Sequence, residues 1–178
     1  MKEHLSRKRN RLVGYDYSQQ SLYYVTLCTK DRKKLFGSLI DDVRSELNPL
    51  TVIVGVDAHI DPPVLGFNQY INLSDCGKTA DKYMRTISGL DCYCIMPDHI
   101  HMIINLNSHQ NGSMWASTTT KNLSQIIKSF KILVTKEIGS SIWQRSFYDH
   151  IIRDYNDYQI RFNYIENNAL NWLDKHQA

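Results

Sequence analysis

Residues 90–106 read LDCYCIMPDHIHMIINL, and this stretch decides the fold class. Residues 90–96 and 101–106 are two apolar, strand-like runs, and Pro97-Asp98 separates them. Runs of this length on either side of a turn dipeptide predict two antiparallel strands joined as a hairpin.

The sequence on both sides of this hairpin alternates between strand-like and helix-like patterns. Aromatic and β-branched runs predict strands at residues 21–30, 51–56 and 147–153. Hydrophobic residues at helical spacing predict helices at 39–47, from a cap at Ser74 and Asp75 to about 87, 123–139 and 157–175. A polar segment at 107–120 is expected to be a loop. This order indicates an α+β fold, an antiparallel sheet with helices on one face.

Composition places the chain among ordinary globular proteins. It has 178 residues, 42% of them hydrophobic and 22% charged, with no internal repeat or Gly/Ser-rich linker, so we expect one domain over 1–178. Its apolar runs fall far short of the roughly 20 residues needed to cross a bilayer. No apolar segment follows the basic N-terminus, so no secretory signal is indicated and a cytoplasmic location is expected.

The four cysteines form no CxxC pair, which argues against a thiolate zinc site. Cys92 and Cys94 alternate on a predicted strand and are expected to pack as small apolar groups in a reducing compartment.

Positive charge is concentrated at the N-terminus. The net charge is only +3, but five of the 21 Lys and Arg residues lie within the first eleven positions. Residues 1–20 therefore form either a basic arm that follows a phosphate backbone or a solvated tail. The candidate DNA contacts in this arm are Arg7, Lys8, Arg9 and Arg11.

The most informative chemical pattern is His99-Ile100-His101. In a strand, side chains two positions apart point to the same face, so both imidazoles project together and Ile100 enters the opposite, apolar side. Two neutral imidazoles on one strand make half of a metal site. From spacing alone, a pair of surface or hydrogen-bonded histidines is the more frequent outcome.

Tyr164 and Asn168 form a second candidate pair. Positions i and i+4 share a helix face, so a phenol and an amide oxygen would point the same way. An amide oxygen can serve as a third hard ligand and a phenol as a nucleophile. The alternative is a core tyrosine with its hydroxyl at the edge, which is common on an amphipathic helix.

Several blocks of the chain resemble one protein family. The run 96–104, MPDHIHMII, resembles the M-P-N-H-hydrophobic-H motif of REP-associated tyrosine transposases, relatives of single-strand transposases of insertion sequences in the HUH nuclease superfamily. Further resemblance lies in RKRNR at 7–11 with GYDY at 14–17 and YVTLCT at 24–29, in WQRSF at 143–147 with DHIIR at 149–153, and in RFNYIENN at 161–168. These blocks occur in order over nearly the whole chain.

The resemblance implies a ferredoxin-like, RRM-type core, with the histidines on a central strand and a nucleophilic tyrosine on a C-terminal helix. It implies an endonuclease that depends on a divalent metal, Mg²⁺ or Mn²⁺, and acts on single-stranded or hairpin DNA. His99 and His101 would be metal ligands, Asn168 the third ligand, and Tyr164 the residue joined to the DNA 5′ phosphate. Relatives include monomers and homodimers, and no motif chooses between them.

Two positions depart from the family pattern. Asp98 stands where the motif often has Asn, and Ala169 replaces a proline that commonly follows the Asn. Neither change is expected to touch the chemistry directly, and Ala169 leaves the helix free to continue.

Other polar residues are candidate DNA contacts, each with a structural alternative. Trp143 stacks on a base or, more commonly, lies in the core. His150 contacts DNA or the metal ligands, or makes a core hydrogen bond. The remaining candidates are Lys128, Lys131, Gln144, Arg145 and Arg153, of which the two lysines alternatively form a solvated helix face.

Three functions remain to be weighed. The first is a transposase-like single-strand DNA nuclease and strand transferase, and the second a catalytically silent nucleic-acid-binding module on the same core. The presence of His99, His101, Tyr164 and Asn168 together favours the enzyme. A phosphodiesterase acting on a small nucleotide would need a closed pocket, whereas the basic arm suits an extended polymer.

Overall fold

A five-stranded sheet forms the centre of the protein. The computed structural model describes residues 21–40, 65–68, 70–106 and 122–176. The sheet has the order β3-β5-β6-β1-β7 and is antiparallel except where β3 lies beside β5. The strands are β1 (Leu22–Cys28), β3 (Leu65–Gly66), β5 (Leu90–Met96), β6 (His99–Asn105) and β7 (Tyr148–Ile152).

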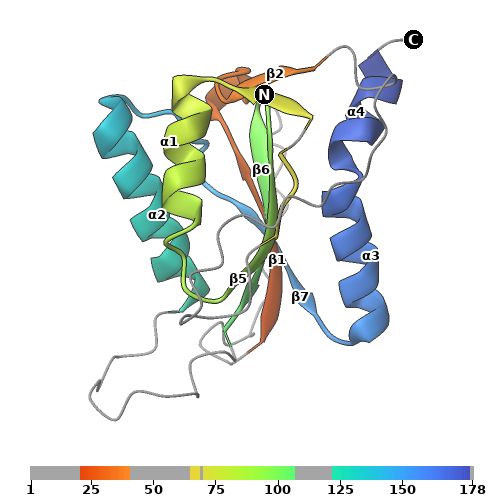
Figure 1. Ribbon diagram of the computed structural model, residues 1–178. Coiled ribbons are helices and arrows are strands. Elements are labelled where there is room, and N and C mark those ends of the chain that lie inside the picture. The colour runs from red at the N-terminus through yellow and green to blue at the C-terminus, as the bar shows by residue number, and fades with distance from the viewer. Residues whose placement is uncertain (1–20, 41–64, 69, 107–121, 177–178) are drawn as a thin grey trace, which may run out of the picture.

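Helices cover both faces of this sheet. Figure 1 shows α1 (Asp75–Met84) and α2 (Leu123–Ile138) on one face, and α3 (Tyr155–Glu166) and α4 (Asn168–His176) on the other. A small sheet of β2 (Gly37–Leu39) and β4 (Ile71–Leu73) lies apart from the main one. The order β1-α1-β5-β6-α2-β7, with the strands arranged β5-β6-β1-β7, is the split β-α-β-β-α-β arrangement. The predicted ferredoxin-like fold is therefore confirmed. Its helices α1 and α2 pack on one face as expected, whereas α3 and α4 lie on the other, because the alternating strands bury an apolar core on each face.

Alternation along the strands produces two apolar cores, one on each face. Val25 and Ile100 are fully buried with α1 and α2, whereas Tyr24 and Ile103 belong to the core beneath α3. Because strand side chains alternate between faces, β6 sends Ile100 to the first core and its two histidines to the second.

Local sequence signals account for several helix ends. The Ser74 side chain accepts a hydrogen bond from the Gly77 amide and starts α1, as predicted. Asn122 and Gln125 form a capping box at the start of α2. Gly139, with φ of 77°, ends α2 in the left-handed conformation that glycine adopts most easily.

Several predicted boundaries were wrong. The final helix does not run unbroken from 157 to 175: it begins at Tyr155, capped by Asp154, and is interrupted at Asn167. The interruption occurs although Ala169 stands in place of a proline, and Ala169 itself is buried in the core beneath α3. β6 begins at His99 because Pro97-Asp98 makes a tight turn.

Other predicted elements differ or lie outside the described residues. α1 ends at Met84 rather than near 87, and Leu39, expected in a helix, lies in β2. Four predicted elements fall outside the described ranges: the rest of the helix at 41–47, the strand at 51–56, the loop at 107–120 and the arm at 1–20.

Cys92 and Cys94 are fully buried and free of disulfide bonds, as their predicted packing requires. Within the described ranges, no helix has the length and apolar character needed to span a membrane.

Candidate active site

The two histidines of β6 lie side by side under α3. His99 and His101 are 5% and 4% exposed, and their ring centroids are 4.5 Å apart. Ile100, between them, is fully buried on the opposite face. Strand alternation thus places both imidazoles together, as the sequence predicted.

One ring nitrogen of His101 is occupied and the other is not. Its Nδ1 lies 2.8 Å from the Tyr24 hydroxyl and 2.9 Å from Thr26 Oγ1. Its Nε2 is buried without a hydrogen-bond partner among the described residues. Burial, reinforced by the charges of His99 and Arg32, lowers the pKa of His101 well below 6.5. The neutral ring can therefore offer a lone pair.

A carboxylate orients His99. Asp98 Oδ1 lies 2.5 Å from His99 Nδ1, and Arg32 Nε lies 3.2 Å from Asp98 Oδ2. Burial alone would raise the pKa of Asp98, but the hydrogen bond to His99 and the charges of His99 and Arg32 outweigh it and lower that pKa. An ionised carboxylate only accepts hydrogen bonds, so Nδ1 donates and Nε2 is left to bind another group.

Tyr164 stands beside the histidine pair with its ring partly in solvent. It is 46% exposed, and its ring centroid lies 5.2 Å from that of His101 and 6.2 Å from that of Tyr24. A phenol in this position is accessible to a ligand that also reaches the histidines.

Three contacts fix α3 over the sheet and so position Tyr164. The His150 ring on β7 lies 2.7 Å from an Asp157 carboxylate oxygen on α3. The Tyr158 hydroxyl donates to Asp91 on β5 at 2.7 Å. Phe162 packs edge-on against Phe67. His150 thus acts as a link between β7 and α3, which is the hydrogen-bonding alternative considered for it.

Asn168 is the first residue of α4 and is 6% exposed. The break at Asn167 separates Asn168 from Tyr164. The prediction that both residues lie on one continuous helix was therefore wrong. Trp172 lies four residues later on α4 and stacks on His99, with ring centroids 5.6 Å apart. Since i and i+4 share a helix face, Asn168 lies on the side of α4 directed to His99.

The side chains at this site determine which metal ion they could coordinate. No group of three His, Cys, Asp or Glu side chains with metal-site geometry occurs in the part of the chain that the structure describes. Nε2 of His101 nevertheless has no hydrogen-bond partner among the described residues, and it is a buried polar atom that a metal ion would satisfy. The pair fits a divalent ion whose remaining ligands are an amide oxygen, water or phosphate.

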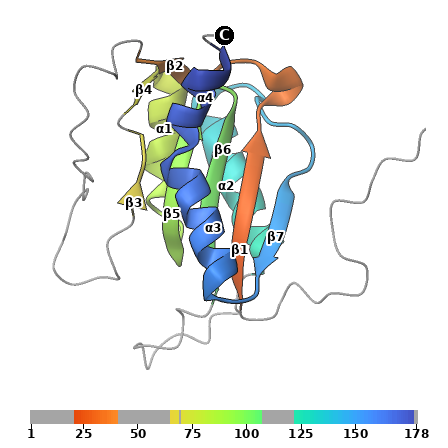
Figure 2. The ribbon, with the colours of Figure 1, turned by 90° about the vertical axis from the view of Figure 1, so that its right-hand side faces the viewer.

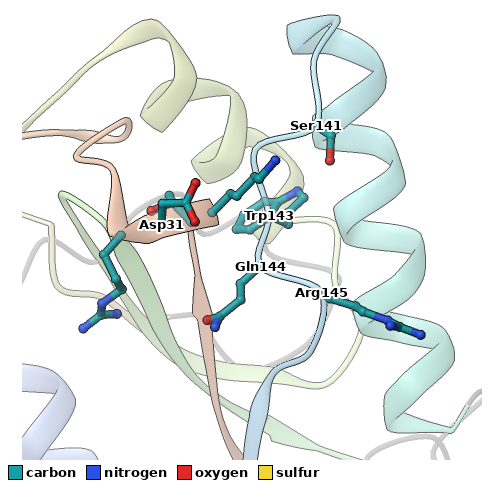
Figure 3. Close-up of a pocket in the computed structure, with 8 residues that line it drawn as sticks. Asp31, Ser141, Trp143, Gln144 and Arg145 are labelled. Carbon is teal, nitrogen blue, oxygen red and sulfur yellow. The ribbon is translucent and has the colours of Figure 1, made fainter. Parts of the chain in front are cut away.

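A pocket of about 540 Å³ opens next to this site, at the end of β1 where β6 begins (Figure 3). The exposed residues Gln144 and Arg145 line it together with Arg32, which also contacts Asp98. Trp143 is only 8% exposed and packs on Phe36 and Phe130, so the core interpretation of Trp143 is confirmed. The complete lining is Thr29, Lys30, Asp31, Arg32, Ser141, Trp143, Gln144 and Arg145.

The other candidate DNA contacts are not gathered at the histidines. Lys128 is exposed on α2, which covers the opposite face of the sheet. Lys131, on the same helix, donates to the carbonyl oxygens of Gln144 and Ser146 at 3.0 and 3.3 Å, and burial lowers its pKa. Arg153 is exposed just beyond the end of β7. The arm residues Arg7, Lys8, Arg9 and Arg11 lie outside the described ranges.

Sequence reasoning missed the residues that hold the histidines. Tyr24 and Thr26 reach His101 only because β1 pairs with β6, and the pairing register is not visible in sequence. No role was predicted from the sequence for Asp98, whose carboxylate pairs with the His99 ring. Its place next to His99 in sequence was the one available signal.

Comparisons with known proteins agree with this geometry. The family described as Transposase IS200 like matches residues 76–168, more than half of the chain. An uncharacterized protein of Haemophilus influenzae is 26% identical over 93% of this chain and 89% of its own length. A putative REP-associated tyrosine transposase of the same organism is 32% identical over 43% of this chain and 47% of its own.

A solved structure has the same fold. It is a REP-associated tyrosine transposase bound to a REP hairpin, and it aligns with a TM-score of 0.51 at 16% identity, over 90% of this chain and 73% of the other.

Proposed function

Because the chain belongs to the IS200-like transposase family, we propose that it cuts and rejoins single-stranded or hairpin DNA, with Tyr164 as the nucleophile. The proposal includes a divalent ion, Mg²⁺ or Mn²⁺, held by His99, His101 and Asn168. It treats residues 1–178 as one catalytic domain, to which the arm at 1–20 adds phosphate contacts.

A single observation carries the proposal. A buried Nε2 without a partner among the described residues belongs to the same histidine whose ring lies 5.2 Å from the ring of the accessible Tyr164. An unsatisfied buried nitrogen is unfavourable unless a ligand uses it. A catalytically silent module would have no need to keep that nitrogen bare beside an exposed phenol.

The chemistry assigned to each residue follows from its position. Tyr164 Oη attacks the scissile phosphorus, a bond forms between them, and the bond from phosphorus to the 3′ oxygen breaks. The DNA 5′ phosphate is then joined to Tyr164, the phenol proton passes to solvent water, and the departing 3′ oxygen takes a proton from water to become a hydroxyl group. A bound divalent ion supplies positive charge to the non-bridging phosphate oxygens. The histidines would hold that ion, and the contacts between α3 and the sheet orient the phenol.

The proposed substrate is unpaired DNA. A strand must bend into the space between Tyr164 and the histidines, and a paired duplex resists that deformation. Gln144, Arg145 and Arg32 around the neighbouring pocket are suited to contact phosphates or base edges of the flanking strand. The hairpin in the solved relative belongs to that protein and motivates hairpin DNA as a substrate here.

Adduct formation on matched oligonucleotides tests this function. We expect labelled single strands and hairpins with unpaired flanks to yield protein-linked DNA on a denaturing gel with Mn²⁺, and the same sequence fully paired to yield far less. Equal adduct from the duplex would contradict the substrate proposal. DNA binding with no adduct from any oligonucleotide would favour the silent binding module.

Asp98 is proposed as the positioning residue of His99. Its carboxylate fixes the proton on Nδ1, and Arg32 holds the carboxylate in turn. Changes to such outer partners weaken metal binding by about 10- to 100-fold. We expect Asp98→Ala to lower Mn²⁺ affinity by this amount.

Asp98→Asn serves as the conservative comparison, because an amide oxygen still accepts from Nδ1 but carries no charge. We expect its Mn²⁺ affinity, measured by calorimetry without DNA, to fall between those of the wild type and Asp98→Ala. If Asp98→Ala binds Mn²⁺ with wild-type affinity, Asp98 has no positioning role at the site.

A further inference from the structure

The sheet face that carries the histidines is only partly covered. Figure 2 views this face with α3 and α4 in front, and β1 and β7 appear beside the helices rather than behind them. Two side-chain contacts of α3 lie toward the other edge of the sheet, since Tyr158 binds Asp91 on β5 and Phe162 packs on Phe67 next to β3. On β7, α3 reaches His150 through Asp157. The open strip of this face is therefore short: it lies at the start of β7, where Tyr148 is 46% exposed, and ends before Ile152, which is buried.

Tyr148 lies on this strip, in line with the histidines. In the antiparallel register, Thr26 pairs with His101 on one side and with Tyr148 on the other. Directly paired residues point to the same face, so the three side chains form one row across β6, β1 and β7. Two strand spacings, about 10 Å, separate the backbone of Tyr148 from that of His101.

The surroundings of Tyr148 connect it to the proposed nucleophile. Both Tyr148 and Tyr164 make edge contacts with the buried Tyr24 ring, at centroid distances of 6.3 and 6.2 Å. Each is 46% exposed. The Arg161 guanidinium lies 5.6 Å from the centre of the Tyr24 ring and places a positive charge beside that ring. Two half-exposed phenol rings thus flank one buried ring on the same face.

We propose that Tyr148 is a stacking platform for an unpaired base adjacent to the scissile phosphate. This inference rests on the proposed function, because that function places the phosphate between Tyr164 and the histidines. The exposed part of the ring offers a flat surface about two strands away, and the uncovered strip leaves room for a base. Stacking on an aromatic ring tolerates any base, so this contact supplies affinity and alignment rather than sequence recognition.

Exposure alone does not select this residue. Tyr155 is 76% exposed, but it begins α3 and is outside the row that Tyr148 shares with His101. The row that it shares with His101 and its contact with Tyr24 distinguish Tyr148 from Tyr155.

The test compares two ligands that differ only in their bases. The full chain is titrated, in chelator to prevent cleavage, with a fluorescent twelve-nucleotide oligothymidylate and with an abasic strand of equal length. We expect the wild type to prefer the thymidylate and Tyr148→Ala to lower that preference roughly tenfold, within the range for loss of one stacked base. Tyr148→Phe should retain the preference because it keeps the ring.

Two further variants keep the result interpretable. Tyr148→Leu fills the space against Tyr24 without an aromatic face, so it should lose the preference even if the alanine variant is poorly folded. Tyr83→Ala removes a tyrosine from α1, on the opposite face of the sheet, and should leave the preference unchanged.

An unchanged preference in folded Tyr148→Ala or Tyr148→Leu would overturn the inference. This outcome is distinct from failure of the proposed function, which would appear as absence of any covalent adduct in the wild type with Mn²⁺. The binding ratio is measured without metal or cleavage and does not depend on that result.

Discussion

Replacing Tyr164 with Phe is expected to abolish the covalent protein–DNA product. Removal of a catalytic nucleophile lowers turnover by several orders of magnitude. The ring of Tyr164 contacts Tyr24 and His101 through its edges and faces, and Phe keeps these contacts. The free energy of unfolding should therefore change by no more than about 1 kcal/mol. A denaturing gel measures the adduct, and thermal unfolding measures stability.

Tyr155→Phe is the matched control for this change. Tyr155 lies on the same helix and is more exposed than Tyr164, so it is the nearest accessible competitor on α3. Its variant should form the adduct normally. An adduct that persists in Tyr164→Phe would identify another nucleophile and contradict the assignment of α3.

Replacing His101 with Ala is expected to remove Mn²⁺ binding and, with it, DNA cleavage. The variant deletes the bare Nε2 that the proposed ion would use. Loss of a direct ligand should exceed the effect of an outer partner, so affinity should fall by more than about 100-fold. Electron paramagnetic resonance of free Mn²⁺ measures binding in the absence of DNA. DNA binding in chelator should largely persist, because phosphate contacts by Lys and Arg need no metal ion.

His150→Ala controls for metal binding by histidines in general. His150 lies on the same sheet but binds Asp157, so its loss should leave Mn²⁺ affinity unchanged. Asn168→Ala should weaken rather than abolish binding, and slow adduct formation should recover at high Mn²⁺. If folded His101→Ala and a second variant, His101→Gln, bind Mn²⁺ as the wild type does, the proposed metal site is wrong.

The strands of the core were predictable because their signals are local. The run of residues 90–106 carries its own turn, and alternation alone places Ile100 opposite the two histidines. The ends of the final helix were less predictable. Asn167 interrupts it where no proline occurs, and the buried residues Ile165 and Ala169 on either side pack into one core. Tertiary packing therefore sets where this helix is interrupted, and helical periodicity in the sequence does not show that position.

The histidine pair could be predicted from the sequence, but its surroundings could not. Spacing within one strand places His99 beside His101, whereas the contacts of His101 with Tyr24 and Thr26 depend on a strand pairing 75 or more residues apart in sequence. Tyr148 enters the site for the same reason, through its pairing with Thr26. Lys131 was a candidate DNA contact from its position on a basic helix, but in the structure it donates to the backbone carbonyl oxygens of Gln144 and Ser146. Its partners could not be predicted from the sequence.

Mass spectrometry of the wild-type adduct tests the central claim most directly. The protein is incubated with a single-stranded hairpin oligonucleotide and Mn²⁺, digested with nuclease and protease, and searched for a peptide carrying a nucleotide. The account predicts a phosphodiester on Tyr164, attached through the 5′ phosphate of the DNA. A nucleotide on any other residue, or linkage through a 3′ phosphate, would contradict it.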